Sequence, residues 1–171
     1  LVAYFFYIDG VNTIITEASL FATAIGIQMA QLLTILLFVQ IVAFPASIMF
    51  GHLAKSVGER LMIIIGIIIY IVIAIMSVFI THAWGFWVMA FLIGSAQGGI
   101  QALSRSYFGK IIPKAFAGEF FGFYNIFGKF SAVLGPLLFG SVAAITGQVQ
   151  LGAASLLIFF VLGGWIFIKY A

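Results

Sequence analysis

The sequence predicts an all-α integral membrane protein, because of its composition and the length of its apolar runs. Of its 171 residues, 65% are hydrophobic and 6% are charged, whereas a soluble domain has about 25% charged residues. From Gln28 to Phe50 and from Leu61 to Ile80 no residue is charged, and about 20 apolar residues cross the hydrocarbon of a bilayer as a helix. No alternation of apolar and polar residues lasts long enough to indicate a transmembrane strand.

Six apolar runs predict six transmembrane helices in one domain over residues 1–171. The expected spans cover residues 1–24, 28–50, 61–80, 84–108, 119–144 and 151–170. Leu1 opens directly in apolar sequence, without an initiator methionine or a cleavage signal. We therefore expect the chain to be a fragment of a longer protein.

The first span carries a polar stripe. Asp9, Asn12, Thr13 and Thr16 repeat at i, i+3, i+4 and i+7, which places them on one side of a helix, with Glu17 at its border. Ionisable residues inside a membrane usually mark a solute or ion pathway. Asp9 and Glu17 are therefore candidate proton or cation sites, and Asn12 is a candidate to line the pathway.

The stretch Gly51–Arg60 separates the second and third apolar runs, and it is expected to be a water-exposed turn. Gly58 suits the residue of positive φ that closes a helix. Lys55 and Arg60 are side chains that hold a loop on the cytoplasmic face of a membrane. Gly51, Gly58 and Arg60 are thus candidates for a cytoplasmic gating loop.

The distribution of basic residues predicts the orientation of the chain. The expected turns near 51–60 and 109–118, together with the end of the last span, contain Lys55, Arg60, Lys110, Lys114 and Lys169. The turns near 25–27, 81–83 and 145–150 contain no lysine or arginine. Because basic residues accumulate on the cytoplasmic side, six spans would leave both termini in the cytoplasm.

The fourth span has glycines and amides on one face. Gly94, Gly98, Gln101 and Arg105 share a stripe, with Gln97 beside it. The glycines are best explained by close helix packing, and Arg105 lies close enough to the span end to extend to the interface. Gln97 and Gln101 remain candidates to line a solute pathway, because their amides can form hydrogen bonds with a solute.

The fifth span adds Asn125 and Lys129 on one face. Lys129 lies ten residues after Glu119, about 15 Å along a helix, where an ammonium needs a carboxylate or a water-filled cavity. One hypothesis is that Lys129 and Asp9 face a common cavity and pair in one state of a transport cycle. The alternative is an ion pair with a purely structural role.

Several functional classes are disfavoured. Basic residues are scattered between spans, so no face suits nucleic acid. Without cysteine, and with two isolated histidines, the chain lacks a thiolate nucleophile and a convincing metal site. No cofactor is expected, and an intramembrane enzyme is a weak alternative because no cluster supplies a nucleophile and a base.

Several motifs resemble the major facilitator superfamily of transporters. They are the loop signature Gly51-x-Leu-Ala-x-x-x-Gly-x-Arg60 and the helix motif Gly135-Pro136-x-x-Phe-Gly140. The loop departs from the superfamily pattern, which usually has an aspartate at position 55 and a basic residue at position 59. Three further segments, 4–14, 98–108 and 119–130, are similar to its vacuole-effluxer (autophagy-related) branch and the bacterial relatives of that branch.

This resemblance implies the C-terminal six-helix half of a twelve-helix secondary transporter in the lipid bilayer. Its partners would be an N-terminal half of the same protein, a small polar solute and a coupled proton. The branch implies efflux of neutral amino acids, from the vacuole in fungal members, and the cell membrane as the location in bacteria. The alternative is a self-contained six-span protein that dimerises as a channel or a structural membrane protein.

Overall fold

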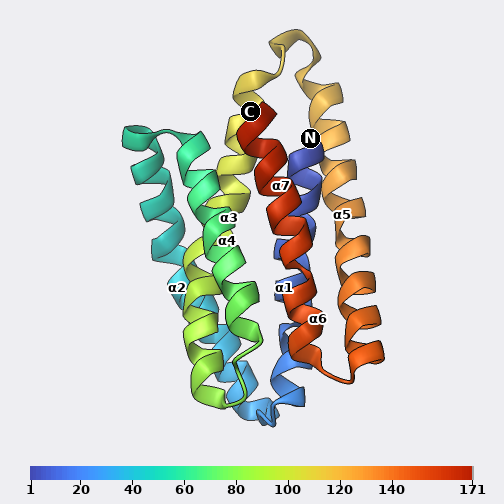
Figure 1. The fold of residues 1–171 in the computed structure, drawn as a ribbon. Helices are drawn as coiled ribbons and strands as arrows, with labels where there is room; N and C mark the ends of the chain where they lie inside the picture. The colour runs from blue at the N-terminus through green and yellow to red at the C-terminus, as the bar shows by residue number, and fades with distance from the viewer. Residues whose placement is uncertain (171) are drawn as a thin grey trace.

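The computed structural model describes residues 1–170, which form helices and no strand. The helices are α1 (Val2–Ala24), α2 (Met29–Val57), α3 (Glu59–Ser77), α4 (Ala83–Ile111), α5 (Ala117–Thr146), α6 (Val149–Ser155) and α7 (Leu157–Tyr170), with a 3-10 turn η1 (Lys114–Phe116) before α5. They run up and down in one elongated bundle (Figure 1). The predicted all-α membrane fold is confirmed, since five helical segments are long and apolar enough to cross a bilayer.

α1 differs from those five segments. It has 23 residues, enough to cross a bilayer, but its polar stripe lowers its hydropathy, and it is not among the five. α1 packs against α7, α5, α4 and α6, and it lies toward the middle of the bundle (Figure 1). Neighbouring helices therefore shield much of the polar stripe of α1 from lipid.

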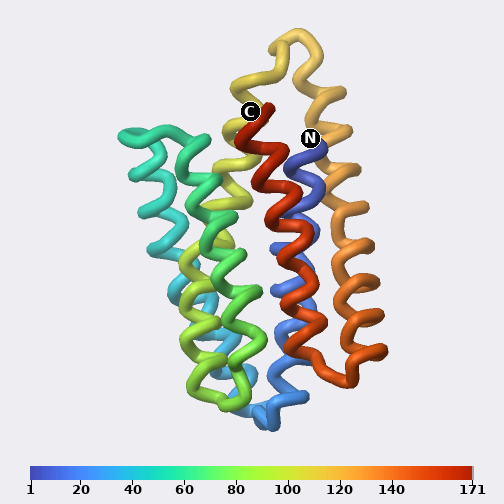
Figure 2. The backbone as a smooth tube through the Cα atoms, viewed as in Figure 1, coloured from blue at the N-terminus to red at the C-terminus, as the bar shows by residue number. Residues whose placement is uncertain are grey.

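The bundle has one basic end. Both termini and the turn that contains η1 lie at the same end of the tube in Figure 2, and the junction at Gly58 lies toward that end as well. The turns around residues 25–28, 78–82 and 147–148 lie at the other end. The predicted segregation of basic residues to one end of the bundle is thus seen in the fold.

The junction between α2 and α3 corrects one expectation. The stretch Gly51–Arg60 was predicted as a turn, but α2 continues to Val57 and α3 begins at Glu59. Only Gly58 interrupts the helices, with φ of +93°, so the expected positive φ at this glycine is confirmed. The apolar run ends at Phe50, but residues 51–57 contain no proline and continue the helix.

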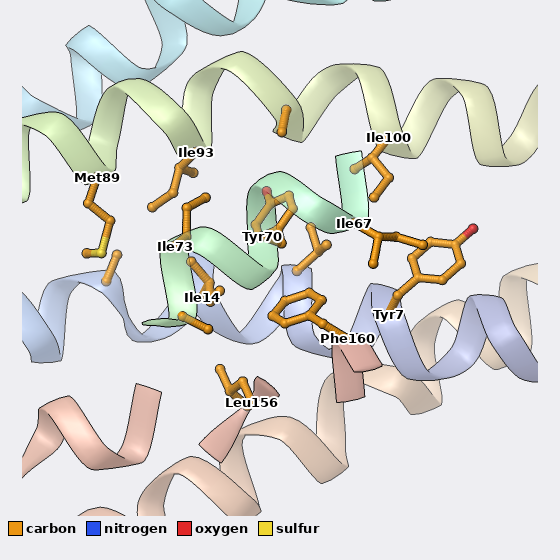
Figure 3. Packing of buried hydrophobic residues seen from close by; sticks show 14 of the residues in the cluster. Tyr7, Ile14, Ile67, Tyr70, Ile73, Met89, Ile93, Ile100, Leu156 and Phe160 are labelled. Carbon is orange, nitrogen blue, oxygen red and sulfur yellow. The ribbon is translucent and has the colours of Figure 1, made fainter. Parts of the chain in front are cut away.

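The predicted last span is also interrupted. α6 ends at Ser155 and α7 begins at Leu157, so that one residue separates two helices. Leu156 itself is fully buried. The apolar core around it is drawn from α1, α3, α4 and the α6–α7 region (Figure 3). Residues labelled there are Tyr7, Ile14, Ile67, Tyr70, Ile73, Met89, Ile93, Ile100, Leu156 and Phe160.

α2 and α4 approach each other closely along the glycines of α4. A Cβ atom on Gly94 would lie 2.8 Å from the carbonyl oxygen of Val39, and one on Gly99 would overlap the Phe50 side chain. The interpretation of these glycines as packing residues agrees with the structure. Small residues of this kind allow helix backbones to approach in membranes.

Candidate functional site

The clearest polar site of the bundle lies where α1 meets α5. Asp9 is 0% exposed, and its Oδ1 accepts a hydrogen bond of 2.9 Å from the backbone N–H of Gly135. A Cβ atom on Gly135 would overlap the Thr13 hydroxyl and lie 2.7 Å from Asp9 Oδ1. Glycine at position 135 therefore lets the α5 backbone reach the carboxyl group of α1.

The carboxyl group of Asp9 is incompletely satisfied. The Thr13 hydroxyl donates to the Asp9 backbone carbonyl at 2.7 Å, so its proton is used within α1. Asp9 Oδ2 is buried and has no hydrogen-bond partner. An ionised carboxylate can accept about four hydrogen bonds, and buried charges are stable only when paired or bonded, so this interface suits a neutral carboxyl group better than a carboxylate.

The rest of the α1–α5 contact combines aromatic and polar side chains. Toward the basic end, the rings of Tyr4 and Tyr124 stack with centroids 4.2 Å apart. Ser131 is fully buried and donates to the Gly128 carbonyl at 2.9 Å. Two turns beyond Asp9, Glu17 is half-buried and borders a small, mainly apolar cavity of about 20 Å³. The two acidic residues of α1 therefore occupy separate places along the same contact.

Lys129 does not pair with Asp9 in this structure. Its side chain is exposed, and within residues 1–170 the ion pair that forms is Lys110–Glu59, at 3.0 Å. Lys129 precedes Gly135 by six residues, which turns it about 120° away from the face of α5 that meets Asp9. The hypothesised contact is thus replaced by a bond from Asp9 to the backbone of α5.

The remaining pathway candidates differ in exposure, and Gln97 borders a small cavity between α1, α2 and α4. Asn12 and Gln97 are half-buried, whereas Gln101 and Asn125 are exposed like Lys129. The three polar stripes therefore do not converge on a cavity inside this six-helix bundle. Only the part of the α1 stripe that contains Asp9 and Thr13 faces inward, against α5.

The candidate gating residues form contacts that the sequence did not reveal. Arg60 donates from Nη2 to the carbonyl of Ile168 in the last turn of α7, at 2.7 Å. Its neighbour Glu59 binds Lys110 Nζ at 3.0 Å and accepts from Ser106 Oγ at 2.7 Å. The first two residues of α3 thus connect it to α7 and α4. Gly51, by contrast, lies within helix α2.

A larger cavity, of about 700 Å³, opens at the basic end between α1, α4, α5 and α7. Its polar groups include the hydroxyls of Tyr7 and Ser104, which are hydrogen-bonded at 2.7 Å. The sequence analysis did not select these residues. A signal existed in the tyrosines at positions 4 and 7, which follow one another at helical spacing, but aromatic residues are too common in this chain to single them out.

Comparison with known proteins identifies the family. Residues 1–170 match the family described as "Vacuole effluxer Atg22 like". The chain belongs to this family. Its helices, its membrane location and the resemblance inferred from its motifs are therefore mutually consistent, and the Atg22-like chain is an integral membrane domain.

Two groups of relatives are similar to this Atg22-like chain. The "Uncharacterized MFS-type transporter YxiO" of Bacillus subtilis is 49% identical over 163 residues, which cover 95% of this chain and 38% of the relative. "Autophagy-related protein 22" of Kluyveromyces lactis is 26% identical, covering 94% of this chain and 35% of that protein. The same-named protein of Vanderwaltozyma polyspora is 30% identical, with shares of 88% and 31%. The Atg22-like chain thus spans about a third of the length of these relatives.

Proposed function

We propose that this chain forms the C-terminal six-helix half of a secondary transporter, which moves a small polar solute by alternating access. The observation that carries the proposal is the exposure of polar side chains on α4 and α5. Asn125, Lys129 and Gln101 are exposed there, in the middle parts of membrane helices. A charge at the centre of a bilayer costs about 2.5–3.5 kcal/mol or more, so Lys129 needs water or a second protein surface, and the two amides need hydrogen-bond partners.

The relatives support a second half. They are about three times as long as this chain, and one of them is named as a major-facilitator-type transporter. Transporters of that superfamily place the solute near the bilayer midplane, between two six-helix halves. Under the proposal, an N-terminal half faces Lys129 and its neighbours across a water-filled path, and the basic end of the bundle faces the cytoplasm.

The exposed side chains fit an amino acid as solute. The ammonium of Lys129 would bind a carboxylate, and the amides of Asn12, Gln97, Gln101 and Asn125 would orient the rest of the solute by hydrogen bonds. Neutral amino acids are the substrate class proposed, and efflux is the direction proposed, which is the direction named in the family description. Asp9 and Glu17 are proposed as proton or cation sites, and no catalytic step is assigned.

The test is transport by the full-length protein in liposomes, with a panel of neutral amino acids and sugars, with and without a proton gradient. We expect uptake of at least one neutral amino acid, and we expect Lys129→Gln to reduce it by about tenfold or more, as for loss of a charged bond to the solute. Lys114→Gln, in the exposed turn η1, is the matched control and should transport normally. Properly inserted protein that moves no solute of the panel would overturn the proposal.

A second candidate function uses the same exposed face. A second copy of the chain would cover it, and the dimer would act as a channel or a structural membrane protein. The polar residues of α4 and α5 are compatible with such an interface, but the greater length of the relatives favours the two-half transporter. Passive conductance by full-length liposomes, without saturation by any amino acid, would support the second candidate instead.

A further inference from the structure

We infer that Asp9 binds the coupled proton, and that its protonation allows α1 to close against α5 at Gly135. This inference rests on the proposed transport function, since it names the group that couples the solute to a proton gradient. The step is a simple association: a proton adds to the free carboxylate oxygen when the interface closes and leaves when it opens. No other bond forms or breaks apart from hydrogen bonds.

The burial of the Asp9 carboxyl group supports this inference. Asp9 is 0% exposed, its Oδ1 has one donor, the N–H of Gly135, and its Oδ2 has none. A dry interface that supplies one hydrogen bond does not compensate for the lost hydration of a full charge. The closed contact therefore holds the neutral acid, and the carboxylate requires water that only an open contact admits.

The surrounding charges do not replace that water. The titratable groups on the helices packed against α1 are Tyr4, Tyr7 and Glu17 on α1 itself, Glu119, Tyr124 and Lys129 on α5, Arg105, Tyr107 and Lys110 on α4, His52 and Lys55 on α2, and Lys169 and Tyr170 on α7. Within residues 1–170, none of the basic groups forms an ion pair with Asp9. Lys129, the basic residue nearest in height on α5, is turned toward the exposed face. No cation in the closed bundle therefore stabilises an ionised Asp9.

Gly135, the hydrogen-bond partner of Asp9, lies next to the proline of α5. Pro136 follows Gly135 inside the helix, and proline has no N–H to give to the carbonyl of residue 132. Helices bend most readily at such positions. A change at Asp9 thus acts next to the proline of α5, where a helix can bend, which links proton binding to movement of α5 relative to α1.

Two transport measurements on the full-length protein separate coupling from solute binding. For an amino acid that the wild type transports, Asp9→Asn should keep exchange of labelled solute without a gradient, because asparagine is neutral and almost identical in shape. Accumulation driven by the proton gradient should fall by about tenfold or more. Glu119→Gln, at the exposed start of α5, is the control and should retain both activities. The inference would be overturned if Asp9→Asn still accumulates the solute under a proton gradient. It would also be overturned if that accumulation is lost in Glu17→Gln but not in Asp9→Asn.

A third measurement uses the proton itself as the probe and needs no solute. Infrared difference spectra between acidic and basic pH should show the carbonyl band of a buried carboxylic acid in the wild type and in Glu119→Gln, but not in Asp9→Asn. Hydrogen exchange at the amide of Gly135, after correction for intrinsic pH dependence, should slow on acidification only where Asp9 is present.

A wild type without transport would refute the proposed function while these spectra still test Asp9. An unchanged band in Asp9→Asn refutes the inference alone. If Asp9→Asn fails to insert, Asp9→Ser is measured in its place with the same expectations.

Discussion

Two helix contacts of this bundle are both closely packed at glycines but differ in chemistry. In the α2–α4 contact, Cβ atoms on Gly94 and Gly98 would lie 2.8 Å from the Val39 carbonyl oxygen and 3.0 Å from the Ser47 Cβ. In the α1–α5 contact, the glycine faces the carboxyl group of Asp9 and the hydroxyl of Thr13 instead. The first contact is limited by backbone and Cβ atoms, which cannot move aside. The second is limited first by two polar side-chain oxygens, with the Thr13 Cβ next at 2.9 Å.

This difference separates a fixed pair of helices from a movable one. The α2–α4 contact depends on van der Waals packing, which does not change with pH. The α1–α5 contact contains a carboxyl group, whose charge state decides whether it can remain dry. We therefore expect α2 and α4 to move as a unit, and α1 and α5 to separate and rejoin during transport. Substitutions at the two contacts should therefore differ in their effects on stability and on transport.

The largest effect is expected at the fixed contact, for Gly94→Ala. The new Cβ would press on the Val39 carbonyl oxygen, so the helices must separate, and overpacking of this kind costs about 1–3 kcal/mol. Thermal unfolding of the full-length protein in detergent measures the loss. Gly140→Ala is the control, because nothing lies within 4 Å of a Cβ at that position. Equal melting temperatures for the two variants would show that α2 and α4 are not in close contact.

An intermediate effect is expected for Gly135→Ala at the movable contact. The two nearest atoms, the Thr13 hydroxyl oxygen and Asp9 Oδ1, belong to groups that can rotate, whereas the Thr13 Cβ, 2.9 Å away, cannot. We therefore expect a loss of stability of about 1–2 kcal/mol, in the lower half of the range for overpacking. Transport should suffer more than stability, because the added methyl group keeps α5 away from Asp9. Transport rate and melting temperature are compared with those of Gly122→Ala, whose Cβ has no neighbour within 4 Å. A variant that transports as the control does would refute closure at Gly135.

The smallest effect is expected for Thr13→Val, also at the movable contact. The Thr13 hydroxyl donates to a backbone carbonyl of its own helix, and that carbonyl keeps its helical bond when the hydroxyl is removed. We expect a change in stability of about 0.5 kcal/mol, at the low end for a hydrogen bond, and gradient-driven transport close to that of the wild type. If gradient-driven transport falls as far as in Asp9→Asn, the hydroxyl takes part in proton binding itself. Thr23→Val, at the exposed end of α1, is the matched control.

The sequence predicts the centres of the helices better than their ends. Apolar runs identify the parts that lie in hydrocarbon, but α2 continues through seven further residues to Val57. Hydropathy reports the medium around a helix, whereas the end of a helix depends on local backbone preferences. In this chain the end is marked by one glycine of positive φ, Gly58.

The candidate site shows a similar limit. The helical spacing of Asp9 and Thr13 correctly predicts a common face, but Lys129 and Asp9, expected to pair in one state of a transport cycle, do not pair in this conformation. Opposite charges are visible in a sequence, whereas the N–H of Gly135 becomes a donor to a side chain only through the packing of two helices. The bond from Glu59 to Lys110 was missed for the same reason, since 51 residues separate them.

The unequal lengths of the helices have a consequence for the lipid around them. α2 and α4 have 29 residues each, or about 44 Å of helix, while α3 has 19 residues, or about 28 Å. The hydrocarbon of a typical bilayer is about 30 Å thick, so α2 and α4 extend well into the headgroup layer or tilt, and α3 is slightly shorter than the layer. In a thicker, sterol-rich membrane the lipid would have to thin locally beside α3, at a cost of a fraction of a kcal/mol per Å. The shortest of the five apolar spans, and not the average one, therefore determines which membranes this protein tolerates best.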